Sequence, residues 1–174
     1  WLARQARRVL TDRNAAGQAP GIVSQLKAEF GRQRKVPGRL RAIWALHSVG
    51  GTDPDWLLER LIPHKRDANE HIRSWAVRLL ADEVWAKGGR RVSADVQSRT
   101  LDTFLELARS EAPSSIVRPY LASALQHLPL DARRRLAEVL VRRKDDVADH
   151  NMGFMIWYGI EALVAERPES AVQL

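Results

Sequence analysis

The chain has 174 residues, of which 45% are hydrophobic and 28% charged, a composition typical of a folded globular protein rather than a disordered one. It contains no cysteine, which excludes disulfides, thiolate metal ligands, a cysteine nucleophile and a Cys-x-x-Cys-His haem attachment motif within these residues. The formal net charge of +7 raises nucleic acid or an acidic protein as a partner. No run approaches the ~18 apolar residues of a membrane span, so none is predicted in this segment.

Five segments along the chain resemble one another. They are Leu2–Leu10, Leu40–Leu46, Ile72–Leu80, Val117–Leu125 and Met155–Leu163. Taking Ala6, Ala45, Ala76, Leu121 and Tyr158 as equivalent positions gives steps of 39, 31, 45 and 37 residues. Such steps are typical of two-helix repeats of the HEAT or armadillo kind. We therefore expect an all-α protein, an α-α superhelix (a HEAT/armadillo-like solenoid) of about four to five helix pairs.

The spacing of apolar residues supports helices in these segments. Ile72, Trp75, Ala76 and Leu79 fall on one stripe of a helix, and no segment shows the sustained alternation of a strand. We expect partner helices between the repeats, near Ile22–Phe30, Asp55–Leu61, Val96–Ala108 and Ala132–Val141, with a short one after Pro168. Residues 1–174 are thus predicted to form a single HEAT-like repeat domain. Because the chain begins at Trp1 without an initiator Met, we expect a fragment of a larger multidomain protein.

Helix starts are predicted from capping residues. The candidate caps are Asp53 before Pro54, Ser93, Ser114 with Ser115, Asp131 and Asn151. Pro119 lies inside an apolar stripe and is tolerated only in the first turn of a helix, so that helix is expected to start at about Ser115.

Several stretches resemble, in order, the HEAT-like region of the large PVC-type haem-binding membrane-bound dehydrogenase proteins of planctomycetes and verrucomicrobia. The stretches are Trp1–Leu10, Leu46–Gly51, His71–Asp82, Val117–Gln126 and Asp146–Glu161. The last of them is the most specific to that family, and the others are shared more widely among HEAT repeats.

The resemblance implies a place for this chain in a larger redox protein. In that family the helical region follows a dehydrogenase-like β-propeller and precedes a c-type cytochrome domain. The implied role is an extracytoplasmic, non-catalytic scaffold or protein-interaction segment that contacts neighbouring domains of the same polypeptide or another protein. No catalytic residue and no cofactor is implied here, because haem c is expected only in the missing part of the parent.

The densest polar cluster comprises Asp146, Asp149, His150 and Asn151, followed by Glu161 within an apolar helix. Carboxylates and a histidine this close could ligate a divalent metal or contact a neighbouring domain. The favoured interpretation is structural, because aspartates that end one helix and begin the next cap the N-terminal dipole. Glu161 is then expected to pair with an arginine of the adjoining repeat, and no metal site is predicted.

A basic surface is the second candidate site. Its residues are Arg90, Arg91, Arg133, Arg134, Arg135, Arg142 and Arg143. Together with tryptophan, such a surface would suit a nucleic-acid-binding protein of the HEAT-like DNA glycosylase type, in which Trp85, Asp82 and the Arg90–Arg91 pair would hold DNA. The scattered distribution of the clusters favours a solvated, ion-paired surface instead.

Structural rather than functional positions are predicted for the remaining histidines and for three of the tryptophans. His47, His64, His71 and His127 are expected at helix ends or on the surface, whereas Trp44, Trp75 and Trp157 are expected in the core. The scaffold function is therefore the leading hypothesis, with nucleic-acid binding as the alternative. A peptide-binding groove anchored by arginine and tryptophan is a third hypothesis.

Overall fold

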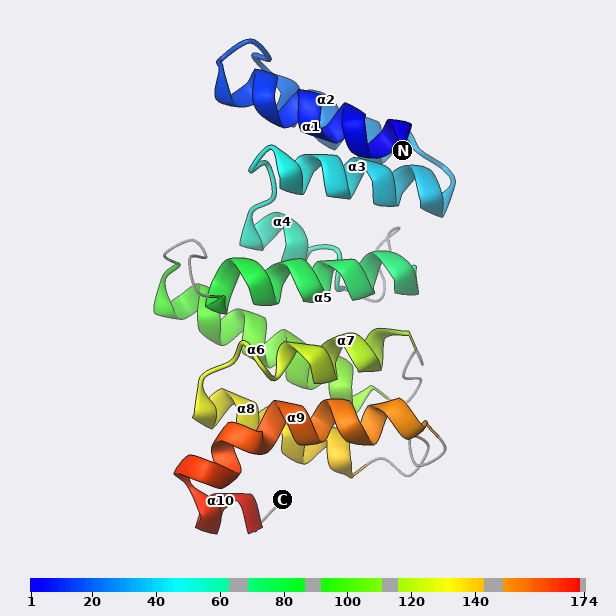
Figure 1. Ribbon diagram of the computed structural model, residues 1–174. Coiled ribbons are helices and arrows are strands. Elements are labelled where there is room, and N and C mark those ends of the chain that lie inside the picture. Colours follow the sequence, from blue (N-terminus) through cyan, green and yellow to red (C-terminus); the bar gives the residue numbers. More distant parts are fainter. Residues whose placement is uncertain (63–68, 87–91, 111–115, 143–148, 173–174) are drawn as a thin grey trace. The chain divides into compact units, whose positions relative to one another are not determined.

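The computed structural model describes residues 1–62, 69–86, 92–110, 116–142 and 149–172, and these contain helices and no strand (Figure 1). The helices are α1 (Leu2–Ala15), α2 (Ile22–Arg32), α3 (Val36–Ser48), α4 (Pro54–Leu58), α5 (Glu70–Trp85), α6 (Ala94–Arg109), α7 (Val117–Ala124), α8 (Leu130–Val141), α9 (His150–Glu166) and α10 (Pro168–Val172). The all-helical prediction is thus confirmed for the described ranges.

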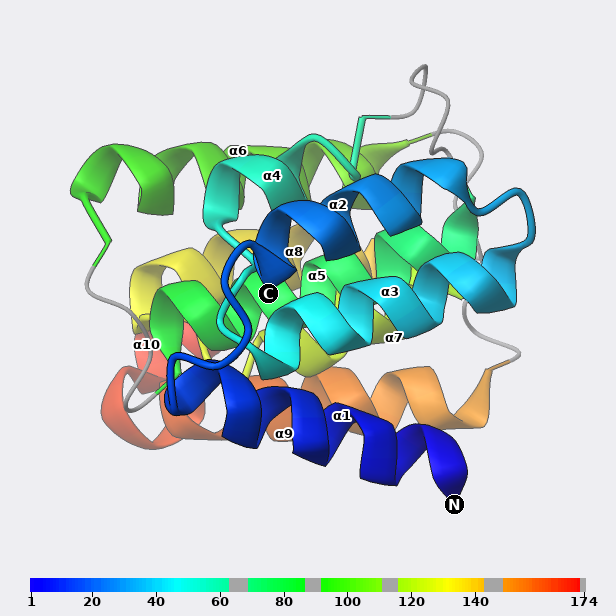
Figure 2. The same ribbon diagram turned by 90° about the horizontal axis from the view of Figure 1, so that it is seen from above.

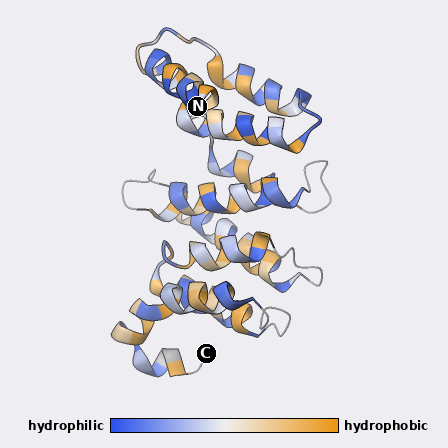
Figure 3. Ribbon diagram, turned by 45° about the vertical axis from the view of Figure 1, so that its right-hand side comes forward, coloured by the Kyte–Doolittle hydropathy of each residue, from blue (hydrophilic) through white to orange (hydrophobic). Residues whose placement is uncertain are grey.

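The chain divides into two compact units, residues 1–56 and 57–174, with the boundary inside α4. The single domain expected from the sequence stays a prediction. Hydrophilic and hydrophobic residues are interspersed along the helices (Figure 3). None of the helices in the described ranges combines the length and hydrophobicity needed to cross a lipid bilayer.

The first unit is built on α3, which packs against both α2 and α1. Phe30 of α2 and Ile43 and Leu46 of α3 are buried. By contrast, α1 has no buried residue. Hydrogen bonds hold α1 to the end of α3, because Thr11 Oγ1 donates to the Ser48 carbonyl at 3.1 Å and Asn14 Nδ2 donates to the Val49 carbonyl at 3.1 Å. These bonds satisfy carbonyls that a helix C-terminus leaves without partners.

The second unit has two layers of helices. In one layer α7 packs against both α5 and α9, and in the other α6 packs against α8, with α10 against α9. Viewed from above, α6 and α8 lie on one side of this unit and α7 and α9 on the other (Figure 2). The helices α7 and α9 approach closely, since a Cβ built on Gly159 would lie 2.6 Å from the Cβ of Leu125.

One buried arginine joins the two layers. Arg118 of α7 is only 2% exposed, and its guanidinium donates to the carbonyls of Ala108 at 3.1 Å and Leu140 at 3.2 Å. These carbonyls lie in the last turns of α6 and α8, where the helix dipole favours a cation. Arg118 therefore caps two helices of one layer from a helix of the other.

Hydrogen bonds confirm two of the predicted helix caps and correct a third. Asp53 and Ser93 act as predicted, with their side-chain oxygens accepting from the backbone N–H groups of Trp56 and Val96. Asn151 was predicted as a cap, which is wrong, because the cap is Asp149, whose Oδ1 accepts from the N–H groups of Asn151 at 2.9 Å and Met152 at 3.3 Å.

The prediction for Asp131 is also wrong. Pro129 begins that helix, since its carbonyl already accepts from the N–H of Arg133 at 2.8 Å, and Asp131 lies in the first turn. Ser114 and Ser115 lie outside the described residues. Because α7 begins at Val117, Pro119 occupies the first turn, where its missing N–H has no helical partner.

Candidate functional site

A groove with a volume of about 440 Å³ opens on the layer formed by α5, α7 and α9. Its lining includes Arg78 and Asp82 from α5, Tyr120, Ser123 and His127 from α7 and the segment that follows it, and Met155 from α9. Charged side chains of both signs and apolar side chains thus line one groove, a combination found in binding sites.

Residues at the same repeat position meet across this groove. Trp75 and Tyr120 each precede the equivalent positions Ala76 and Leu121 by one residue, and their ring centroids lie 6.5 Å apart. Asp82 and His127 each follow those positions by six residues, and Asp82 Oδ1 lies 3.7 Å from His127 Nε2. Side chains with equal offsets from the predicted equivalent positions thus lie close together, a pairing absent from the sequence-based predictions.

Arg78 is the cation of the groove. Its guanidinium lies 5.1 Å from the centroid of the Trp75 ring, a cation–π arrangement. Arg78 is exposed and forms no salt bridge with any residue in the ranges that the structure describes. Its charge is therefore available to a ligand.

The structure gives the residues of the predicted polar cluster separate positions on α9. Asp149 is the helix cap, His150 and Asn151 are exposed, and Glu161 pairs with no arginine among the described residues. Asp146 lies outside the described residues. No group of three or more His, Cys, Asp or Glu side chains that could hold a metal ion occurs in the described part of the chain.

An aromatic stripe runs along the outer face of α9 beside these polar residues. It consists of His150, Phe154, Trp157 and Tyr158, which we call the α9 stripe. The His150 and Phe154 rings meet edge to face at 4.9 Å, and Phe154, Trp157 and Tyr158 are 50%, 51% and 59% exposed. Contiguous exposed aromatics on a folded protein mark an interaction surface.

The prediction that Trp157 is a core residue is therefore wrong. The buried face of α9 follows Met152, Ile156, Gly159 and Leu163. Trp157 follows Ile156 by one residue, which turns its side chain about 100° around the helix and away from the core. Trp44 and Trp75 are half-buried.

The predicted basic surface is largely engaged within the chain. Arg133 donates to the carbonyls of Gln126 and Leu128, both at 3.1 Å. Arg134 and Arg142 pair with Glu138 at 3.9 and 2.6 Å, and Arg135 pairs with Asp102 at 3.7 Å. Partial burial lowers the pKa of Arg133, and the charge of Glu166 opposes that change. Arg90, Arg91 and Arg143 lie outside the described residues.

Of the residues expected to hold DNA in the alternative function, only Trp85 and Asp82 lie in the described ranges. Trp85 packs edge to face on Phe104 with centroids 5.9 Å apart, so it closes the α5–α6 pair. Asp82 faces His127 instead of a site with Trp85.

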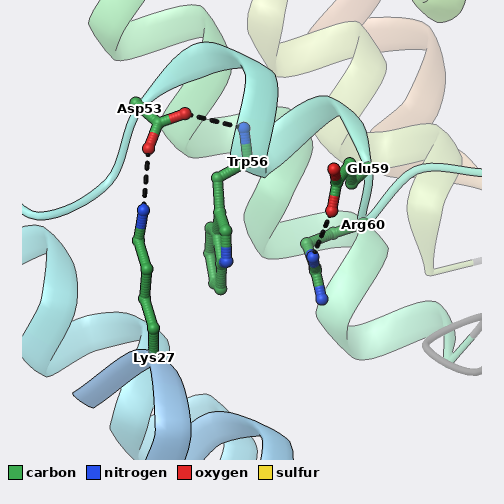
Figure 4. A network of polar contacts seen from close by, with 5 residues as sticks. All are labelled: Lys27, Asp53, Trp56, Glu59 and Arg60. Atoms are coloured by element: carbon green, nitrogen blue, oxygen red, sulfur yellow. Dashed lines mark hydrogen bonds and ion pairs between the residues drawn. The ribbon is translucent and has the colours of Figure 1, made fainter. Parts of the chain in front are cut away.

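A second polar network, around α4, serves the fold (Figure 4). In the first unit, Asp53 accepts from Lys27 Nζ at 2.9 Å and from the Trp56 N–H at 2.8 Å, and Phe30 packs edge to face on Trp56. In the second unit, Glu59 pairs with Arg60 at 2.7 Å. Burial lowers the pKa of Arg60, and Glu59 opposes that change. Asp53 thus caps the short helix α4.

No protein family, curated protein or solved structure matches this chain.

Proposed function

We propose that this chain is a non-catalytic, HEAT-like scaffold that binds a protein partner through the outer face of α5, α7 and α9. The observation that carries the proposal is the α9 stripe, in which Phe154, Trp157 and Tyr158 each keep half or more of their surface exposed. Tyrosine and tryptophan at this exposure are typical anchors of protein interfaces.

The layered arrangement supports the HEAT-like part of the proposal. The repeat helices α5, α7 and α9 follow one another in one layer, and the partner helices α6 and α8 form the second. Stacked helix pairs of this kind bury a continuous core and leave long faces free for binding.

The resemblance suggests which protein the partner is. In the proposed setting the chain is an extracytoplasmic segment between a dehydrogenase-like propeller and a c-type cytochrome domain, and its partner is one of those domains. Reading the parent gene tests this setting. A gene that encodes neither a propeller upstream nor a Cys-x-x-Cys-His motif downstream would remove the redox setting and leave the scaffold proposal in place.

The scaffold itself is tested by site-specific cross-linking. A photoreactive amino acid at Trp157 is expected to capture a protein in cells of the source organism. The matched control is Gln97, an exposed residue of α6 in the other layer. Equal capture from both positions, or none from position 157, would contradict the proposal.

The alternative function, nucleic-acid binding, is weakened by the pairing of Arg133, Arg134, Arg135 and Arg142 within the chain. Cations that neutralise DNA phosphates make affinity fall steeply with salt. Titration of duplex DNA at several salt concentrations decides between the two. Tight binding at low salt with a steep salt dependence would favour the alternative.

A further inference from the structure

We propose that the groove between α5 and α7 binds a glutamate or aspartate side chain of an extended peptide, with Arg78 as the residue that contacts the carboxylate. This inference rests on the proposed function, because the peptide would belong to the partner protein. It assigns a residue, a site and a ligand chemistry to the surface described above.

Arg78 offers an exposed cation at the edge of the groove. Its guanidinium carbon lies 5.1 Å from the centroid of the Trp75 ring. A guanidinium can donate two parallel hydrogen bonds to a carboxylate. Since Arg78 has no salt bridge within the described ranges, a ligand need not displace an internal partner.

Asp82 supplies the carboxylate among the described residues that line the groove. Asp82 lies one turn after Arg78 on α5, but its Oδ1 faces His127 Nε2 at 3.7 Å. Asp82 is thus directed towards the segment that follows α7. Ser123, which has on α7 the offset that Arg78 has on α5, also lines the groove and adds a hydroxyl donor to it.

The size and polarity of the groove favour a peptide ligand. Tyr120 and Met155 contribute apolar surface to a space of about 440 Å³, larger than one carboxylate requires. The ligand therefore carries apolar atoms next to its charge, as a short peptide segment does. Nucleic acid fits less well, because phosphate backbones are bound by several cations in a row, and Arg78 is the one arginine among the described residues that line this groove.

The test uses two peptide libraries labelled with fluorescein, capped at both ends, with a fixed central glutamate or a fixed central glutamine and randomised flanking residues. Fluorescence anisotropy with the whole chain is expected to show binding of glutamate peptides and weaker binding of the glutamine set. Arg78→Gln is expected to weaken glutamate binding roughly 10- to 100-fold. Arg99→Gln is the matched control, since Arg99 is an exposed arginine of α6 paired with Asp95, and this variant is expected to bind like the wild type.

A charge reversal keeps the test decisive if Arg78→Gln alters the fold. Arg78→Glu is expected to lose the glutamate preference and to gain binding of a third library with a fixed lysine. Equal binding of the glutamate and glutamine libraries, or glutamate binding that Arg78→Gln leaves unchanged, would overturn the inference. So would Arg78-dependent binding of duplex DNA with no peptide binding.

The outcome separates this inference from the proposed function. Cross-linking at position 157 without glutamate-dependent peptide binding would keep the scaffold and reject the groove. If neither cross-linking at position 157 nor glutamate-dependent peptide binding is observed, both the scaffold proposal and the groove proposal are rejected.

Discussion

The two layers of the second unit differ in how two sets of their exposed arginines are paired, those of α8 and Arg78 of α5. On α8, Arg134 and Arg142 share Glu138, and Arg135 reaches Asp102 of α6. On the α5–α7–α9 layer, Arg78 has only an aromatic ring beneath it, and aromatic side chains stand half exposed. A net charge of +7 is therefore a weak guide to binding, because three arginines of the α8 cluster already lie in ion pairs within the chain.

The largest expected effect comes from removing the link between the layers. Arg118→Met deletes the donors to the Ala108 and Leu140 carbonyls and leaves both buried without these partners. We expect the free energy of unfolding to fall by about 2–5 kcal/mol, measured by urea denaturation.

The matched control for this change is Arg99→Met. Arg99 is exposed and pairs with Asp95 at i,i+4, so its loss should cost only about 0.3–0.5 kcal/mol. Similar costs for the two variants would show that Arg118 does not join the layers energetically.

The next effect concerns the contact between α7 and α9. Gly159→Ala places a methyl group 2.6 Å from the Cβ of Leu125, and the resulting shift should cost roughly 1–3 kcal/mol in thermal or chemical denaturation. Gly153→Ala in the same helix meets nothing within 4 Å and should stabilise the protein by roughly 0.5–1 kcal/mol. Stabilisation by both substitutions would contradict the close approach of these helices.

A smaller effect on stability is expected from the ion pairs on the surface of α8. Glu138→Gln removes the shared partner of Arg134 and Arg142, both of which are exposed pairs. The loss of stability should be about 0.3–1 kcal/mol and should shrink as salt is added, since surface ion pairs are screened. A loss that is independent of salt would show that this layer is not held by exposed ion pairs.

The smallest effect on stability is expected from a substitution in the α9 stripe. Trp157→Ser removes a side chain that is 51% exposed, so the free energy of unfolding should change by no more than about 0.5 kcal/mol. Cross-linking from a photoreactive residue at Tyr158 should nevertheless decrease in this variant. A large loss of stability would mean that Trp157 supports the core, and the comparison between the layers would then fail.

The helices could be predicted from sequence because their apolar residues recur with the period of a helix. Ile72, Ala76 and Leu79 are buried as that period predicts. The error at Trp157 has the same origin, because a shift of one residue in the repeat alignment moves a side chain by about 100°. Periodicity therefore predicts that a segment forms a helix more reliably than it predicts which of two adjacent residues is buried.

The candidate groove could have been predicted in part. Once Ala76 and Leu121 are taken as equivalent, Asp82 and His127 have the same offset and must be neighbours if the repeats stack. The partners of Arg118 could not be predicted in this way, because Ala108 and Leu140 are 10 and 22 residues distant and bind through backbone carbonyls common to all residues. The predicted helix cap was wrong where two neighbouring residues could both accept from the first backbone N–H groups, as Asp149 and Asn151 could.

The attachment of α1 in the first unit has a consequence for the dynamics of the protein. Because α1 buries no residue and is held to α3 through Thr11 and Asn14, its local opening exposes little apolar surface. Regions with few buried contacts open at low free energy, well below global unfolding. Amide protons of α1 should therefore exchange with solvent before those of α3, and trypsin should cut after Arg8 or Arg13 while the rest of the chain stays folded.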